Sequence, residues 1–141
     1  MWHMLWPILI VVGANTLYNI CTKSTPAEIN SFASLAITYV IAAVLALVFF
    51  FCTSEEKHLL REISKANWSA FALAFSIVFL EFGYICIYRA GWKVSAASLV
   101  ANIVLACILV FVGILLYRES ISPRQLAGIA VCALGLILIG K

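Results

Sequence analysis

Five long runs of apolar residues dominate this sequence and restrict it to very few folds. They cover residues 5–21, 32–52, 68–88, 94–117 and 126–139. A helix that crosses a membrane needs about 20 mainly apolar residues, whereas the strands of a membrane barrel alternate polar and apolar positions over segments of about 10. The runs show no such alternation. The sequence therefore predicts an all-α, polytopic membrane helix bundle with five transmembrane helices per chain.

The composition supports a membrane protein and narrows its chemistry. The chain is 65% hydrophobic and 11% charged, whereas soluble domains are about half apolar and a quarter charged. A net charge of +3, spread over the loops, gives no sign of nucleic-acid binding. The five cysteines lie in or beside apolar runs without metal-ligand spacing. We therefore predict no metal, no cofactor and, since no nucleophile and base occur at usable spacing, no enzymatic activity.

Two short patterns predict where helices begin. Residues 122–125 (Ser-Pro-Arg-Gln) place a serine at the N-cap, a proline at the first helical position and a glutamine at the third. Residues 25–28 (Thr-Pro-Ala-Glu) repeat this pattern. We predict a single repeat over residues 1–141 with helices over about 5–22, 28–52, 68–90, 94–117 and 122–140. The surface loop at 53–67 fits either a short amphipathic helix on the membrane or a solvated linker.

Glu81 is the one acidic residue placed well inside an apolar run. The other five acids, all glutamates, lie in polar breaks between runs. A carboxylate at mid-depth in a membrane is costly and suggests a functional site. Because burial favours the neutral form of a carboxylic acid, Glu81 is predicted to exchange protons. The alternative is a protonated side chain that only forms a structural hydrogen bond.

Polar residues form stripes at helical spacing around this position. Positions i, i+3 and i+7 share a helix face, which groups Glu81 with Tyr84 and Tyr88. The predicted substrate or proton site combines three such stripes: Glu81, Tyr84, Tyr88, Asn15, Asn19, Asn102 and Ser98. The alternative for the amides and hydroxyls is hydrogen bonding between helices. Small residues on the last helix, Gly128, Cys132 and Gly135, are predicted to form a dimer seam.

The basic residues give almost no topological bias. With five spans, one side of the membrane receives Lys57, Arg61, Lys65, Arg118 and Arg124, and the other receives Lys23, Arg89, Lys93 and Lys141. An excess of Lys and Arg holds loops in the cytoplasm, so a balanced chain is predicted to insert in both orientations. Two opposed copies would supply the inverted repeat of an alternating-access transporter. Alternatively, the three basic residues of the long loop fix one orientation.

Three segments of the C-terminal half carry a family resemblance: residues 96–99 (Ala-Ala-Ser-Leu), 117–121 (Tyr-Arg-Glu-Ser-Ile) and 125–128 (Gln-Leu-Ala-Gly). With the glycine-rich last helix, they resemble the end of an EamA-like repeat of the drug/metabolite transporter superfamily. The whole chain resembles one five-helix repeat, where most members have two, and is distantly similar to small multidrug resistance proteins. The opening helix of those proteins carries an embedded glutamate. The comparable position here is Asn15, which cannot exchange a proton.

The resemblance implies a secondary transporter that exports small metabolites or amphipathic compounds from an inner or plasma membrane. Together with the charge balance, it leads us to expect an antiparallel homodimer with alternating access and proton coupling through Glu81. The expected partners are a small-molecule substrate and the lipid bilayer. The alternative is a partner-dependent subunit, inactive alone, of a heterodimeric transporter or lipid-carrier flippase formed with a second short chain.

Overall fold

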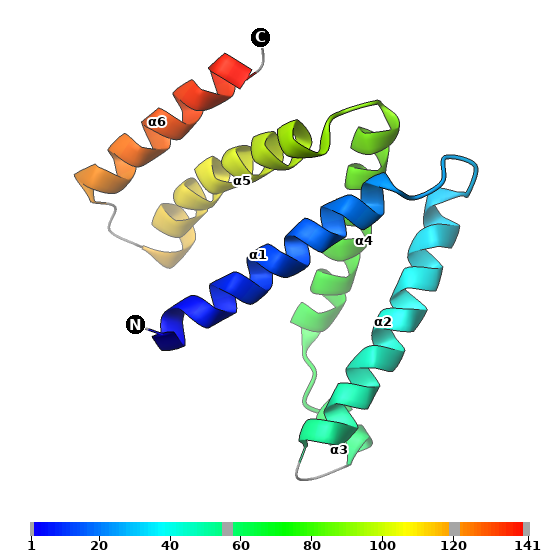
Figure 1. The fold of residues 1–141 in the computed structure, drawn as a ribbon. Helices are drawn as coiled ribbons and strands as arrows, with labels where there is room; N and C mark the ends of the chain where they lie inside the picture. The colour runs from blue at the N-terminus through cyan, green and yellow to red at the C-terminus, as the bar shows by residue number, and fades with distance from the viewer. Residues whose placement is uncertain (1, 55–57, 119–121, 140–141) are drawn as a thin grey trace. The chain divides into compact units, whose positions relative to one another are not determined.

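The computed structural model describes residues 2–54, 58–118 and 122–139, and every regular element in these ranges is a helix. The elements are α1 (Trp2–Lys23), α2 (Ser31–Thr53), α3 (Leu59–Ile63), α4 (Trp68–Arg89), α5 (Val94–Tyr117) and α6 (Pro123–Ile139) (Figure 1). They form two compact units, Met1–Ala90 with α1 to α4 and Gly91–Lys141 with α5 and α6. The predicted all-α class is confirmed.

Four helices in the described ranges are long and apolar enough to cross a membrane. They are α2, α4, α5 and the part of α1 from Leu5 to Lys23. The last helix, α6, has 17 residues and is not among them. The structure therefore supports a multi-pass membrane protein with four candidate spans, against the five predicted.

The surface of these helices suits a lipid environment. Large apolar side chains point outward along them, with Phe49 65% and Phe71 79% exposed. Water would disfavour so much exposed apolar surface, whereas the hydrocarbon interior of a bilayer accommodates it. The buried side chains of the first unit come instead from the helix ends nearest the α1–α2 turn: Asn19, Ser31, Leu35, Ile85 and Tyr88.

The helix α2 begins three residues later than predicted, at Ser31 rather than residue 28. Asn30 is its N-cap, and Asn30 Oδ1 accepts hydrogen bonds from the backbone N–H of Phe32 at 2.9 Å and of Ala33 at 3.3 Å. Asparagine is among the best N-cap residues. The preceding turn is held by Arg89, whose guanidinium donates to the carbonyl oxygen of Ile29 at 2.6 Å.

The start of α6 carries the reciprocal cap that its sequence predicts. The Ser122 backbone N–H donates to Gln125 Oε1 at 2.8 Å, and the Gln125 backbone N–H donates to Ser122 Oγ at 3.3 Å. Pro123 is the first residue of the helix. Two backbone donors that the helix itself cannot satisfy thus find partners.

Part of the loop between α2 and α4 is helical. The five-residue α3 exposes Leu60 by 83% and Ile63 by 57%. On the same segment Lys65 forms an ion pair with Glu62. Exposed apolar side chains beside charged ones agree with the amphipathic-helix alternative, in which α3 would lie on the membrane surface. Residues 55–57 of this loop lie outside the described residues.

Candidate functional site

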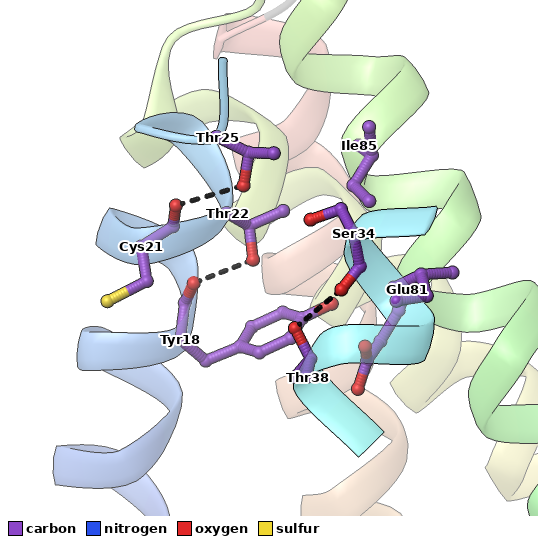
Figure 2. Close-up of a pocket in the computed structure, with 9 residues that line it drawn as sticks. Tyr18, Cys21, Thr22, Thr25, Ser34, Thr38, Glu81 and Ile85 are labelled. Carbon is purple, nitrogen blue, oxygen red and sulfur yellow. Dashed lines mark hydrogen bonds between the residues drawn. The ribbon is translucent and has the colours of Figure 1, made fainter. Parts of the chain in front are cut away.

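A pocket of about 140 Å³ lies among α1, α2 and α4, wholly within the first unit. Figure 2 shows its wall, with Tyr18 of α1 reaching towards α2. Its lining consists of Tyr18, Cys21, Thr22 and Thr25 from α1 and the turn after it, Ser34, Leu35 and Thr38 from α2, and Glu81 and Ile85 from α4.

Glu81 supplies the only carboxylate in this lining. It lies eight positions before Arg89, the last residue of α4, which places it about 12 Å inside that end at about 1.5 Å of helix per residue. No ion pair of Glu81 occurs among the described residues. The guanidinium of Arg89 is bonded to the α1–α2 turn instead, at Pro26, Ile29 and Ser31. The pocket therefore holds an acid without a basic partner.

Tyrosine side chains surround the Glu81 carboxylate. The phenols of Tyr18 on α1 and Tyr39 on α2 both lie close enough to interact with it electrostatically. Neither phenolic oxygen, though buried, has a hydrogen-bond partner of ordinary geometry among the described residues. The Tyr84 ring packs edge-on against Tyr18, with centroids 5.7 Å apart. The acid thus lies beside two phenolic hydroxyl groups, and that of Tyr39 is near enough to act on it as a hydrogen-bond donor.

The threonine hydroxyls of the pocket already use their protons within their own chain segments. Thr22 Oγ1 donates to the Tyr18 carbonyl at 2.8 Å, Thr25 Oγ1 to the Cys21 carbonyl at 3.3 Å, and Thr38 Oγ1 to the Ser34 carbonyl at 3.0 Å (Figure 2). A hydroxyl has one proton to donate and two lone pairs that accept. These three hydroxyls therefore present acceptors to the pocket.

Three predicted site residues form a separate polar contact between α1 and α4. Asn19 Nδ2 donates to Asn15 Oδ1 at 2.9 Å and to the Asn15 carbonyl at 2.8 Å. The Tyr88 hydroxyl donates to Asn19 Oδ1. None of these three residues is in the pocket lining. The Tyr88 ring adjoins the Tyr84 ring, with centroids 6.1 Å apart, and Tyr84 in turn packs against Tyr18 of the pocket lining. This polar contact is thus connected to the pocket through two aromatic rings.

The remaining predicted residues belong to the second unit. Asn102 Nδ2 donates to Ser98 Oγ at 3.2 Å, one turn away on α5. That this pair shares a cavity with Glu81 stays a prediction. On α6, Gly128 and Cys132 are exposed and Gly135 is partly exposed, and neither glycine has an atom within 4 Å of where a Cβ would stand. The dimer seam also stays a prediction.

The sequence pattern that defines the EamA-like transporter family matches residues 2–141, nearly the whole chain. The chain belongs to the EamA-like transporter family. Comparison with curated proteins and with solved structures finds no significant match. The predicted family is thus confirmed, and this EamA-like protein is a multi-pass membrane transporter of small molecules rather than an enzyme.

Several pocket residues of this EamA-like transporter were missed by the sequence prediction. On α2, Ser34 and Thr38 line the pocket and Tyr39 approaches Glu81. A signal was present, because Ser31, Ser34 and Thr38 stand at i, i+3 and i+7 in an otherwise strongly apolar helix. On α1, the predicted stripe began at Asn15, whereas the pocket takes the face that begins at Tyr18.

Proposed function

We propose that this EamA-like transporter exports small metabolites or amphipathic compounds by alternating access, as an antiparallel homodimer with proton exchange at Glu81. The observation that carries the proposal is the position of Glu81, in the middle part of a candidate span and in the wall of a pocket among three helices. Family membership provides the transport activity. The pocket is where we propose that the solute and the proton bind.

The groups near Glu81 support the proposal of proton exchange. They include the phenols of Tyr18 and Tyr39, and no basic side chain pairs with the acid in the described part of the chain. An unpaired carboxylate is strongly disfavoured once a pocket is closed off from water. In the closed state Glu81 would therefore carry either a proton or a cationic group of the substrate. Competition between these two occupants is the basis of antiport.

We propose that α6 is the fifth span. Its 17 residues extend about 26 Å at about 1.5 Å per residue, close to the roughly 30 Å of hydrocarbon in a bilayer. The reciprocal cap of Ser122 and Gln125 lets the helix begin at the interface, with Arg124 reaching the headgroups. Five spans would place the two ends of the chain on opposite sides of the membrane.

The homodimer proposal rests on the charge balance and on α6. Two opposed copies would generate the inverted repeat that a single five-helix chain lacks. Gly128, Cys132 and Gly135 share one helix face, and space is open at both glycines. Small residues let helices approach closely in a membrane. We therefore place the seam of the dimer along α6.

The test is the orientation of the chain in an inner or plasma membrane. A reporter active on only one side is fused after Lys141, with and without one lysine added to either set of loops. Dual insertion predicts reporter signal from both sides of the membrane. A single added lysine should then shift most of the signal to one side. A fixed orientation that ignores the added lysine would overturn the antiparallel homodimer. In that case, activity restored by a second short chain would favour the heterodimeric transporter or flippase subunit.

A further inference from the structure

The pocket beside Glu81 combines a carboxylate with threonine hydroxyls that can accept hydrogen bonds. We propose that it binds a small primary ammonium ion, with the Glu81 carboxylate as counter-ion and the hydroxyls of Thr22 and Thr38 as acceptors for its N–H groups. This inference rests on the proposal that the pocket is the transport site. It adds the chemical class of the substrate.

Charge selects a cation. The lining contains one carboxylate and no basic side chain. The nearest cation along α4, Arg89, is bonded to Ser31 Oγ at 2.8 Å and to two turn carbonyls. An anion would therefore meet Glu81 without a positive group to offset it, which is unfavourable in a membrane interior. The ring of Tyr18 in the wall adds an aromatic group of the kind that attracts ammonium ions.

The hydrogen-bond acceptors of the pocket favour cations that carry N–H groups. The hydroxyls of Thr22, Thr25 and Thr38 donate to carbonyls of their own segments, so towards the pocket they can only accept. A primary ammonium has three N–H groups, which match Glu81 and two such hydroxyls. A quaternary ammonium carries the same charge but has no proton to donate. The pocket should therefore discriminate between the two.

Volume limits the size of the ligand. The pocket encloses about 140 Å³, and a protein cavity of about 150 Å³ holds one benzene molecule. A ligand of about six non-hydrogen atoms would therefore fill this volume. Short aliphatic amines and amino alcohols are of this size.

The experiment compares four probes of similar size on the purified full-length protein in lipid nanodiscs: n-butylammonium, tetramethylammonium, n-butanol and butyrate. Binding is measured by calorimetry at neutral pH. We expect n-butylammonium to bind at least about tenfold more tightly than tetramethylammonium or n-butanol, because each charge-assisted hydrogen bond lost is worth about tenfold or more. Butyrate should not bind. This comparison needs no variant, so it does not depend on any mutant folding.

Two pairs of variants locate the binding site. Glu81→Gln should weaken n-butylammonium binding at least about tenfold, while Glu62→Gln, the same change on α3, should have no effect. Thr22→Val should weaken n-butylammonium binding but not the weaker tetramethylammonium binding. Its control is Thr16→Val, since Thr16 donates to the Val12 carbonyl at 2.8 Å in the same way but is exposed and outside the pocket.

Three results would overturn the ammonium proposal: equal affinity for n-butylammonium and tetramethylammonium, preferential binding of butyrate, or no binding of any probe. These results are separable from failure of the proposed function. Dual insertion with no ammonium binding would leave the antiparallel transporter standing and remove only the substrate class. Ammonium binding by a chain of fixed orientation would support the substrate class and remove the antiparallel homodimer.

Discussion

The hydroxyl of Tyr88, at the end of α4, donates a hydrogen bond to Asn19 Oδ1 in α1, across 69 residues of sequence. Asn19 in turn donates to Asn15, one helical turn earlier, so the bonds run in one direction from α4 into α1. Asn19 is 4% and Tyr88 5% exposed. The contact fixes α1 against α4, and those two helices supply Tyr18 and Glu81 to the pocket.

Removing the Tyr88 hydroxyl should loosen this contact. Tyr88→Phe leaves Asn19 Oδ1 without its donor, and hydrogen bonds between membrane helices contribute about 0.6 kcal/mol on average and up to about 1.7. We expect a loss of unfolding free energy in this range, measured by titration of the protein in lipid micelles with a denaturing detergent. Tyr117→Phe, at an exposed position near the end of α5, is the matched control. Equal losses in the two variants would contradict an interhelical role for Tyr88.

Replacing Arg89 by lysine should free the α1–α2 turn. The guanidinium donates to the carbonyls of Pro26 and Ile29 and to Ser31 Oγ, and a lysine cannot reproduce this fork of donors. We expect amide hydrogen exchange in residues 27–31 to accelerate about tenfold, as for the loss of about 1.4 kcal/mol of local stability. Arg124→Lys makes the same change at the start of α6 and should leave the turn unaffected. Unchanged exchange in Arg89→Lys would show that Asn30 alone holds the turn.

These contacts also explain which helix starts could be predicted. The cap of α6 involves Ser122 and Gln125, which are three residues apart, so the local pattern contains all the information. The turn before α2 depends on Arg89, some 60 residues further along the chain, and on the capping strength of Asn30. The four-residue pattern at 25–28 includes neither Arg89 nor Asn30. The start of α2 was therefore predicted three residues too early.

The pocket residues also divide into those that the sequence could predict and those that it could not. Glu81 was predicted because a lone carboxylate in an apolar run is expensive wherever the helix faces. The facing of uncharged polar residues is set by packing, which the sequence does not specify. Asn19 thus bonds to Tyr88 and does not line the pocket. Thr38 donates to the Ser34 carbonyl of its own helix and also lines the pocket. Only the placement of α1, α2 and α4 together reveals this difference.

Occupation of the pocket should protect Cys21 from alkylation. Cys21 is one of the residues that line the pocket, and it is exposed. In a variant that retains only this cysteine, n-butylammonium at ten times its dissociation constant should slow the reaction with N-ethylmaleimide about tenfold, since the rate follows the unoccupied fraction. A variant that retains only Cys52, near the end of α2 and outside the lining, is the control. Protection of both cysteines alike would indicate a change in the bilayer rather than binding.

Binding of n-butylammonium should weaken as the pH falls. A protonated Glu81 offers no negative charge, so protons and the ammonium ion compete for the same carboxylate. The residual affinity of Glu81→Gln should not change over the pH range in which the wild type changes. Calorimetry across that range provides the measurement, and Glu62→Gln should keep the wild-type profile. A pH dependence that survives in Glu81→Gln would assign the titration to another group.

Crosslinking along α6 should distinguish an antiparallel from a parallel dimer. Gly128 and Gly135 flank Cys132 on one helix face, near the middle of the helix. In an antiparallel pair the position of Gly128 meets that of Gly135 in the other copy, whereas in a parallel pair each position meets itself. A disulfide requires Cα atoms within about 7 Å, so the two arrangements give different products.

The design removes Cys132 by Cys132→Ala and places Gly128→Cys and Gly135→Cys on two separately tagged chains. An antiparallel dimer predicts oxidised dimers that carry both tags when the chains are coexpressed, and few dimers when either variant is expressed alone. Dimers of each variant alone, without the mixed product, would establish a parallel seam. A separate chain that keeps Cys132 and both glycines provides the reference, because a residue at the centre of the seam meets its own copy in both arrangements and should crosslink whichever is correct.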